Sequence, residues 1–185
     1  QVVERALDGD PHRQAIARGL VAATNRAAGV IDQLLDLSRL SGSEVVRQPV
    51  DMSKLTDAVA RVMASAAIAK GQTFEAEIAP DIFVEGQLEA LMMVVRNLLD
   101  NAIRYTPAGG EVGVGLDRLD NGSVVLRVFD TGPGVPAERQ RAMFDRFVRL
   151  SSSEPGSGLG LSIVDRIVTR HNGDISVANR EPHGL

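Results

Sequence analysis

The sequence of 185 residues is long enough for one sizeable domain and a smaller element. Hydrophobic residues make up 44%, which suffices for a packed core, and the absence of cysteine excludes disulfides and zinc-thiolate sites. The formal net charge of −4 argues against nucleic acid as the main partner, because nucleic-acid binding normally relies on a basic surface. No run of about 18 apolar residues occurs, so no segment of the sequence is expected to span a membrane.

The first part of the chain predicts a helical hairpin. Residues 15–40 read as one long amphipathic helix, because apolar residues recur at intervals of three and four. Residues 2–7 read as the end of a preceding helix, and the turn residues 8–11 separate the two. The apolar stripe favours a homodimer through a four-helix bundle, and packing against the chain's own domain is the alternative.

A domain boundary is expected near residues 41–50, where Pro49, Asp51 and Ser53 offer a turn and a helix cap. It divides the chain into a partial dimerisation hairpin, residues 1–42, and a second domain, residues 43–185. The second domain alternates between helical and strand patterns, which predicts an α+β sandwich with helices on one face of a mixed sheet. The expected helices are 55–69, 88–105 and 158–171, and the expected strands are 73–78, 111–116, 123–129 and 175–178.

Two turns are also expected between these elements. Asp120, Asn121 and Gly122 form a turn signal between the strands 111–116 and 123–129. Asn172 and Gly173 tolerate the left-handed backbone conformation, and they are expected to end the last helix.

The first of three polar blocks lies on the helix 88–105. Asn97 and Asn101 are four residues apart and Arg104 follows three later, so all three side chains share one face. A carboxamide oxygen suits Mg²⁺, which in nucleotide sites takes one or two protein oxygens besides phosphates and water, and Asn101 is the chosen ligand. Arg104 adds positive charge toward a triphosphate. A merely solvated pair of asparagines is the alternative.

The second block follows the strand 123–129. Asp130 stands at the carboxyl end of that strand, where its carboxylate can accept a hydrogen bond from the amino group of adenine. Gly132 and Gly134 remove side chains that would obstruct a flat base. An ordinary turn is the alternative reading of this block.

The third block opens the helix 158–171. Gly156, Gly158 and Gly160 precede an apolar helical segment, so backbone N–H groups at the helix start can face a phosphate. A flexible hinge is the alternative. Between the second and third blocks, Phe144 is expected in the core, and the segment from Arg149 to the third block could close over a nucleotide as a lid.

The three blocks together resemble the motifs of a known family, the catalytic part of bacterial sensor histidine kinases. This family shares a superfamily with DNA gyrase, MutL and a heat-shock chaperone. Residues 97–105 resemble its asparagine box, residues 130–134 its first glycine box, residues 144–147 its phenylalanine box, and residues 156–161 its second glycine box. Order and spacing agree over roughly residues 90–175. Residues 33–40 resemble the second helix of the family's dimerisation hairpin. The resemblance implies a Bergerat-type ATP-binding fold.

The resemblance implies ATP and Mg²⁺ as cofactors and assigns roles to the matched positions. Asn97 and Arg104 would be the catalytic residues near the phosphates, and Asn101 would hold the metal ion. Tyr105 would lie by the adenine, whose amino group Asp130 would receive. The residues implied to bind the nucleotide are Asn97, Asn101, Arg104, Tyr105, Asp130, Gly132, Gly134, Arg149, Gly158, Leu159 and Gly160.

The sequence also departs from the family pattern. The phosphoacceptor histidine would lie upstream of residue 1, and His12, His171 and His183 do not fit it, so all three are read as structural or solvated. Gln87 stands where an acid is common, and Asn172 where glycine is common. The lid is short, and the closing strand expected after residue 179 is missing. We therefore expect a fragment that cannot autophosphorylate alone.

The function implied by the resemblance is transfer of the γ-phosphoryl group of ATP to a histidine and then to an aspartate of a response-regulator receiver domain. The location implied is the cytoplasmic side of the bacterial inner membrane, with membrane attachment only through other segments. One alternative is an ATP-hydrolysing clamp of the gyrase or MutL type, but such clamps place a water-activating glutamate where Asn97 stands. The other alternative is a module that only binds nucleotide.

Overall fold

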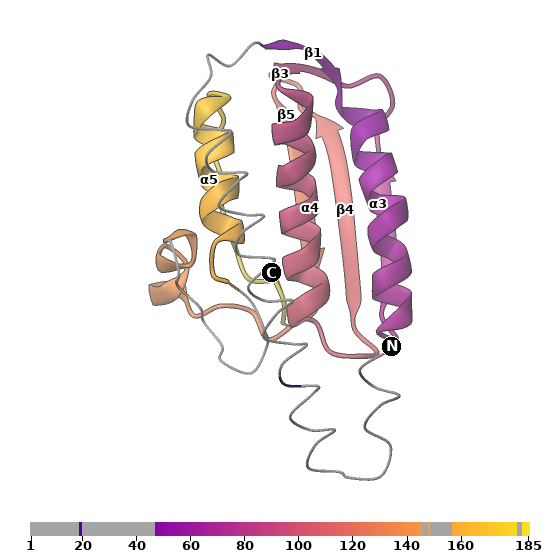
Figure 1. Cartoon of the computed structure of the whole chain (residues 1–185), viewed down its shortest axis with the longest axis vertical. Helices are drawn as coiled ribbons and strands as arrows, with labels where there is room; N and C mark the ends of the chain where they lie inside the picture. The colour runs from indigo at the N-terminus through magenta and orange to yellow at the C-terminus, as the bar shows by residue number, and fades with distance from the viewer. Residues whose placement is uncertain (1–18, 20–46, 146–147, 149–156, 181–182) are drawn as a thin grey trace.

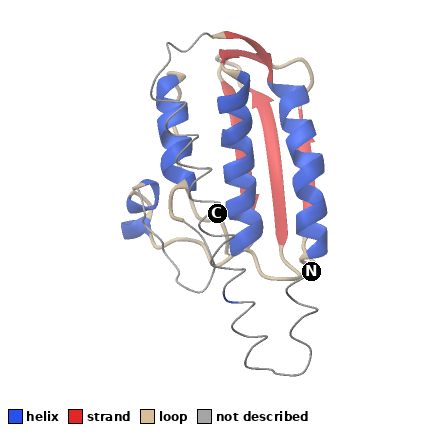
Figure 2. Ribbon diagram, viewed as in Figure 1, coloured by secondary structure: helices blue, strands red, loops and turns tan. Residues whose placement is uncertain are grey.

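The computed structural model describes residues 19, 47–145, 148, 157–180 and 183–185. In this part of the chain three helices lie on one face of a mixed β-sheet (Figures 1 and 2), which confirms the predicted α+β class. Apart from residue 19, the predicted hairpin of residues 1–42 lies outside the described residues. The division into two domains therefore stays a prediction.

The helices α3 (Met52–Ala69), α4 (Leu88–Tyr105) and α5 (Gly160–Arg170) correspond to the three expected ones. α3 begins three residues before the expected start, because Asp51 caps it by accepting a hydrogen bond from Lys54 N at 3.0 Å. Ser53, the other expected cap, lies inside the helix and donates to Ala79 O at 2.7 Å. α5 ends where Asn172 adopts the predicted left-handed conformation, with φ 58°.

The main sheet contains β2 (Thr73–Ile78), β4 (Glu111–Arg118) and β5 (Val124–Asp130), in the order β2-β4-β5. β2 runs parallel to β4, and β4 runs antiparallel to β5, so the sheet is mixed as predicted. Gly122, with φ 85°, completes the expected turn between β4 and β5.

The small second sheet was not predicted. β1 (Gln48–Asp51) pairs antiparallel with β3 (Phe83–Gly86), with Val50 opposite Val84. The expected turn at Pro49 is therefore wrong, because Pro49 lies within β1. Its missing N–H is tolerated since β1 pairs with β3 alone among the described strands.

The expected strand 175–178 is also wrong. Residues 173–180 form no helix or strand, and none of the described strands pairs with them. The alternation in this segment does correspond to alternating burial, since Ile175 and Val177 are half-buried while Ser176 and Ala178 are exposed. Alternation predicts a strand only where a partner strand supplies the hydrogen bonds.

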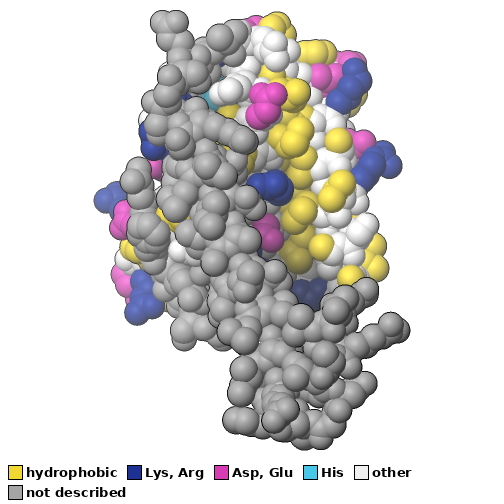
Figure 3. Space-filling model, in the orientation of Figure 1, with side chains coloured by type: hydrophobic (Ala, Val, Ile, Leu, Met, Phe, Trp, Pro, Cys, Tyr) yellow, Lys and Arg dark blue, Asp and Glu magenta, His cyan; other side chains and the backbone are white. Residues whose placement is uncertain are grey.

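α4 lies between α3 and α5 and belongs to both apolar cores. Val95, Leu99 and Ile103 join α3 and the sheet in the first core, while Ala90 and Val94 pack with α5 in the second. On the face drawn in Figure 3, further apolar side chains gather over α3 and α4. Among the described helices none is both long and apolar enough to cross a bilayer.

Two glycines on the outer face of β4 give a matched test of packing. A Cβ at Gly113 would lie 2.1 Å from Phe129 Cζ, whereas the nearest atom to a Cβ at Gly115 is Arg127 Nε at 3.7 Å. We expect Gly113→Ala to lower the free energy of unfolding by about 1 to 3 kcal/mol, because the ring must leave its place under the Arg180 guanidinium. Gly115→Ala is the control and should be nearly neutral. Urea titration measures both, and equal effects would contradict the assigned contact.

Candidate functional site

The three polar blocks meet around the C-terminal half of α4. A Cβ at Gly160, where α5 begins, would lie 3.0 Å from Asn97 Oδ1. A Cβ at Gly132, in the loop after β5, would lie 3.0 Å from Tyr105 O. Glycine at both places lets the two loops approach α4 closely. The first block therefore contacts both glycine blocks.

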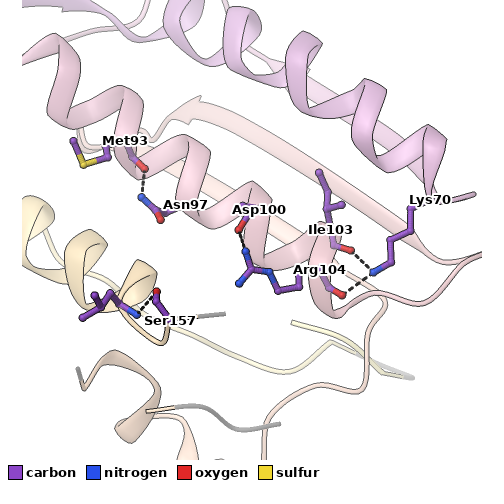
Figure 4. A network of polar contacts seen from close by, with 8 residues as sticks. Lys70, Met93, Asn97, Asp100, Ile103, Arg104 and Ser157 are labelled. Carbon is purple, nitrogen blue, oxygen red and sulfur yellow. Dashed lines mark hydrogen bonds and ion pairs between the residues drawn. The ribbon is translucent and has the colours of Figure 1, made fainter. Parts of the chain in front are cut away.

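The polar side chains of α4 differ in their hydrogen bonds and ion pairs within the chain (Figure 4). Asn97 Nδ2 donates to Met93 O at 2.8 Å, which holds this amide along the helix. Arg104 forms an ion pair with Asp100, one turn earlier, and its side chain is 29% exposed. Asn101 is half-buried, and its side chain makes no hydrogen bond within the described part of the chain. Asn101 is therefore the amide with both polar atoms available within the described residues, whereas Asn97 has only its Oδ1 available.

The donor set bears on which metal ion could bind here. Among the described residues there is no group of three or more histidine, aspartate or glutamate side chains that could hold a metal ion. An ion at this place would depend on one amide oxygen, with its other ligands supplied by phosphate oxygens and water. That donor set fits Mg²⁺, which prefers oxygen ligands and keeps several waters.

Asp130 is almost fully buried at the end of β5, with 7% of its surface exposed. Its Oδ1 accepts a hydrogen bond from Gly132 N at 2.7 Å. Burial raises the pKa of the Asp130 carboxyl above its ordinary value, and hydrogen bonds from the backbone of Gly132 and Leu185, with the charge of Arg180, partly offset that effect. A carboxylate has about four lone-pair sites, so the backbone hydrogen bonds from Gly132 and Leu185 leave it able to accept a further one from a ligand.

The start of α5 is suited to an anion. Gly158 has φ 72°, which turns the chain into the helix, and Leu159 is the N-cap. Leucine has no side-chain acceptor, so the first N–H groups of the helix receive no cap from it. The Leu159 side chain is fully buried in the second core, and its N–H donates to Ser157 Oγ at 3.2 Å (Figure 4). Leu159 could therefore meet a ligand only through its backbone.

Several expectations lie outside the described residues. They concern Phe147, Arg149, Gly156 and the lid between them, together with His12. The expectation that Phe144 belongs to the core is wrong. Its side chain is half-buried on the short helix η2 (Ala142–Phe144), and it joins neither apolar core.

Of the two other histidines, His183 is exposed and His171 has a structural role. His171 Nε2 accepts from Gln87 N at 3.1 Å, and Nδ1 lies 2.8 Å from Ile167 O. Both contacts are satisfied when the ring is neutral and carries its proton on Nδ1. His171 therefore joins the end of α5 to the start of α4, and Gln87, which stands at the expected acidic position, takes part through its backbone.

The sequence did not reveal the role of Asn179. Its Oδ1 accepts from Val135 N at 2.9 Å, and its Nδ2 donates to Val135 O at 2.9 Å. Gln140 Nε2 donates to the same carbonyl at 3.2 Å. A Cβ at Gly134, which has φ 69°, would lie 3.0 Å from Asn179 Oδ1. Asn179 therefore fixes the loop that follows Asp130, and a contact across 44 residues leaves no local sequence signal.

Comparison with known proteins gives a family match over the same elements. Residues 86–185 match the family model described as histidine kinase-, DNA gyrase B-, and HSP90-like ATPase. The signal transduction histidine-protein kinase/phosphatase MprB of Mycobacterium tuberculosis is 37% identical over 168 residues. The match covers 89% of this chain but only 32% of that relative, so the chain spans about a third of its length.

Solved structures share the fold. The mycobacterial sensor histidine kinase MprB superposes with a TM-score of 0.66 at 37% identity, covering 75% of this chain and 92% of that chain. The full-length ShkA structure, solved in complex with AMPPNP, superposes with a TM-score of 0.76 at 27% identity. That match covers 95% of this chain and 37% of ShkA.

The Asn179 contact can be tested with two asparagine variants. We expect Asn179→Ala to speed hydrogen exchange at the Val135 amide about tenfold, because the amide loses its acceptor. Asn121→Ala is the control, since Asn121 Oδ1 accepts from Ser123 N in the exposed turn between β4 and β5. Unchanged exchange at Val135 in both variants would contradict the role given to Asn179.

Proposed function

The chain belongs to the family of histidine kinase-, DNA gyrase B- and HSP90-like ATPases, and we propose that it is the ATP-binding catalytic part of a bacterial two-component sensor histidine kinase. The observation that carries the proposal is the meeting of Asn97, the uncapped start of α5 and the buried Asp130 around one end of α4. Similarity to the histidine kinase MprB and to the AMPPNP-binding protein ShkA supports it.

The adenine would lie at the loop after β5. The Asp130 carboxylate would accept a hydrogen bond from the adenine amino group, and guanine, which carries an oxygen at that position, would be rejected. Gly132 and Gly134 would leave room for the flat base, with Tyr105 beside it. The AMPPNP in the ShkA complex is an ATP analogue, which supports nucleotide binding by this chain.

The phosphates would lie between α4 and α5. The first N–H groups of α5, beside Gly158 and Gly160, would face the phosphate oxygens, since a helix N-terminus favours an anion. Arg104 would exchange its ion pair with Asp100 for phosphate. Asn101 would hold Mg²⁺, which would neutralise phosphate charge when bound. Arg149 would contribute from the lid.

The reaction would be an in-line transfer of the γ-phosphoryl group. A neutral imidazole nitrogen of a histidine outside this chain would attack the γ-phosphorus, and the bond from that phosphorus to the bridging oxygen would break to leave ADP. The protein's contribution would be positioning and charge neutralisation, with Asn97 and Arg104 nearest the transferred group. The phosphoryl group would then pass to an aspartate of a response-regulator receiver domain.

The assembly belongs to the same proposal. Residues 1–42 would form part of a dimerisation hairpin in a homodimer. Attachment to the bacterial inner membrane, with this part on the cytoplasmic side, would depend on segments other than residues 1–185. Nucleic acid would not be a partner.

Nucleotide binding tests the assigned roles. We expect Mg²⁺-dependent binding of ATP in preference to GTP in titration calorimetry, because Asp130 accepts from the adenine amino group. Asn101→Ala should remove the part of the affinity that Mg²⁺ adds. Asn121→Ala, an exposed asparagine in the turn after β4, is the control. Equal affinities for ATP and GTP would contradict the role of Asp130, and an unchanged Mg²⁺ titration of Asn101→Ala would contradict that of Asn101.

The phosphoryl acceptor distinguishes a kinase from a clamp. With a protein that includes the upstream hairpin helix, we expect label from γ-labelled ATP to appear on the protein as acid-labile, base-stable phosphohistidine. Asn97 supports this outcome, since an amide cannot activate water as a glutamate does. Steady release of phosphate with no labelled protein would favour the ATP-hydrolysing clamp and overturn the proposal. Nucleotide binding with neither product would leave only a binding module.

A further inference from the structure

The C-terminal end of α4 is capped by two side chains from the turn that follows α3. Lys70 Nζ donates to Ile103 O at 2.8 Å and to Arg104 O at 2.7 Å (Figure 4). Gln72 Nε2 donates to Ile103 O at 2.9 Å and to Thr106 O at 2.6 Å. The last four carbonyls of a helix have no partner within its own ladder, and these bonds satisfy two of the four, those of Ile103 and Arg104, together with the carbonyl of the C-cap residue Thr106.

The turn is built so that both side chains reach α4. Gly71 N donates to Ile68 O and Gln72 N donates to Ala67 O, which is the Schellman pattern of a helix end, with Gly71 at φ 77°. Gly71 O accepts from Gly109 N at 2.8 Å, in the loop after α4. The turn is therefore tied to α4 by backbone bonds as well as by the two side chains.

The capped turn includes two residues of the candidate site. Arg104 is the cation assigned to phosphate, and the carbonyl of Tyr105 is the atom that lies against Gly132. Because Gln72 is 5% exposed and Lys70 is partly buried, neither can shift without moving the last turn of α4. The positive charge of Lys70 also favours the negative end of the helix dipole. A displacement of this turn would move Arg104, Tyr105 and the loop at Gly132 together.

We propose that Lys70 and Gln72 are positioning residues for nucleotide binding, which set the last turn of α4 and through it the places of Arg104 and Tyr105. This inference rests on the proposed function. Neither residue touches the nucleotide. Their loss should therefore weaken binding of the adenine moiety as well as of the triphosphate.

Lys70→Met in the full chain is the first test, because methionine keeps much of the length and removes the donors. We expect its affinity for ATP, measured by titration calorimetry with Mg²⁺, to be about tenfold weaker than that of the unchanged chain. The affinity for adenosine, measured by a chemical-shift titration, should fall by a similar factor, and Lys70→Arg should restore most of both. Lys54→Met is the matched control, because Lys54 is exposed at the other end of α3, where it forms a salt bridge with Asp51.

Gln72→Met is the second test of the inference. Gln72→Met should weaken ATP binding in the same direction, since it removes the other cap at similar volume. A lower melting temperature with unchanged nucleotide affinity would mean that the cap is only structural, and would overturn the inference. A loss confined to ATP, with adenosine unaffected, would mean that Lys70 contacts phosphate directly, and would also overturn it. Failure of the unchanged chain to bind ATP would instead contradict the proposed function.

Discussion

The structure depends on how α4 is held between its neighbours. One side of this helix packs on the sheet and α3, another packs on α5, and both apolar cores include it. Asn97, Asn101 and Arg104 continue, at helical spacing, the side of α4 on which Ala90 and Val94 pack against α5, and all three are half-buried. A helix fixed by packing on two sides keeps its remaining side chains at defined places, which a binding site needs. Any change that loosens α4 therefore affects core and site together.

The glycines of the site have a structural reason that does not depend on a ligand. Gly160 faces the side chain of Asn97, and Gly132 faces the backbone of Tyr105, at distances that a Cβ could not occupy without displacing its neighbours. The same approach brings the start of α5 and the loop after β5 against α4. The absence of a side chain at these glycines thus permits both the close packing and the access of a ligand. A glycine-rich motif in this chain is evidence for a close approach of backbones as much as for a phosphate.

The sequence predicted the elements whose signal is local. The helix at 88–105 and the strand at 73–78 have the expected bounds, because apolar periodicity and flanking turn residues decide them. The small sheet of β1 and β3 was missed, since Pro49 indicates a turn when no partner strand is known. The strand expected at 175–178 was wrong because its alternation is not matched by a partner among the described strands.

The site could be predicted only in part for a related reason. Residues on one helix face or in one loop are grouped by spacing, and the polar blocks were found in this way. The residues that fix those blocks act over distance, since Gln72 lies 31 residues before Ile103 and Asn179 lies 44 residues after Val135. Every residue has a backbone carbonyl, so a side chain that donates to one does not require any particular residue type at that position. The sequence therefore gives no sign of which residue is the partner.

The contacts around α5 connect the site to the start of the described domain. Arg47, just before β1, donates to Arg170 O at 2.7 Å at the end of α5, and the neighbouring His171 holds the start of α4 through Gln87 N. The other end of α5 faces Asn97 across Gly160. α5 thus meets Arg47 at its C-terminal end and faces Asn97 at its N-terminal end, so the place of this one short helix depends on contacts at both ends.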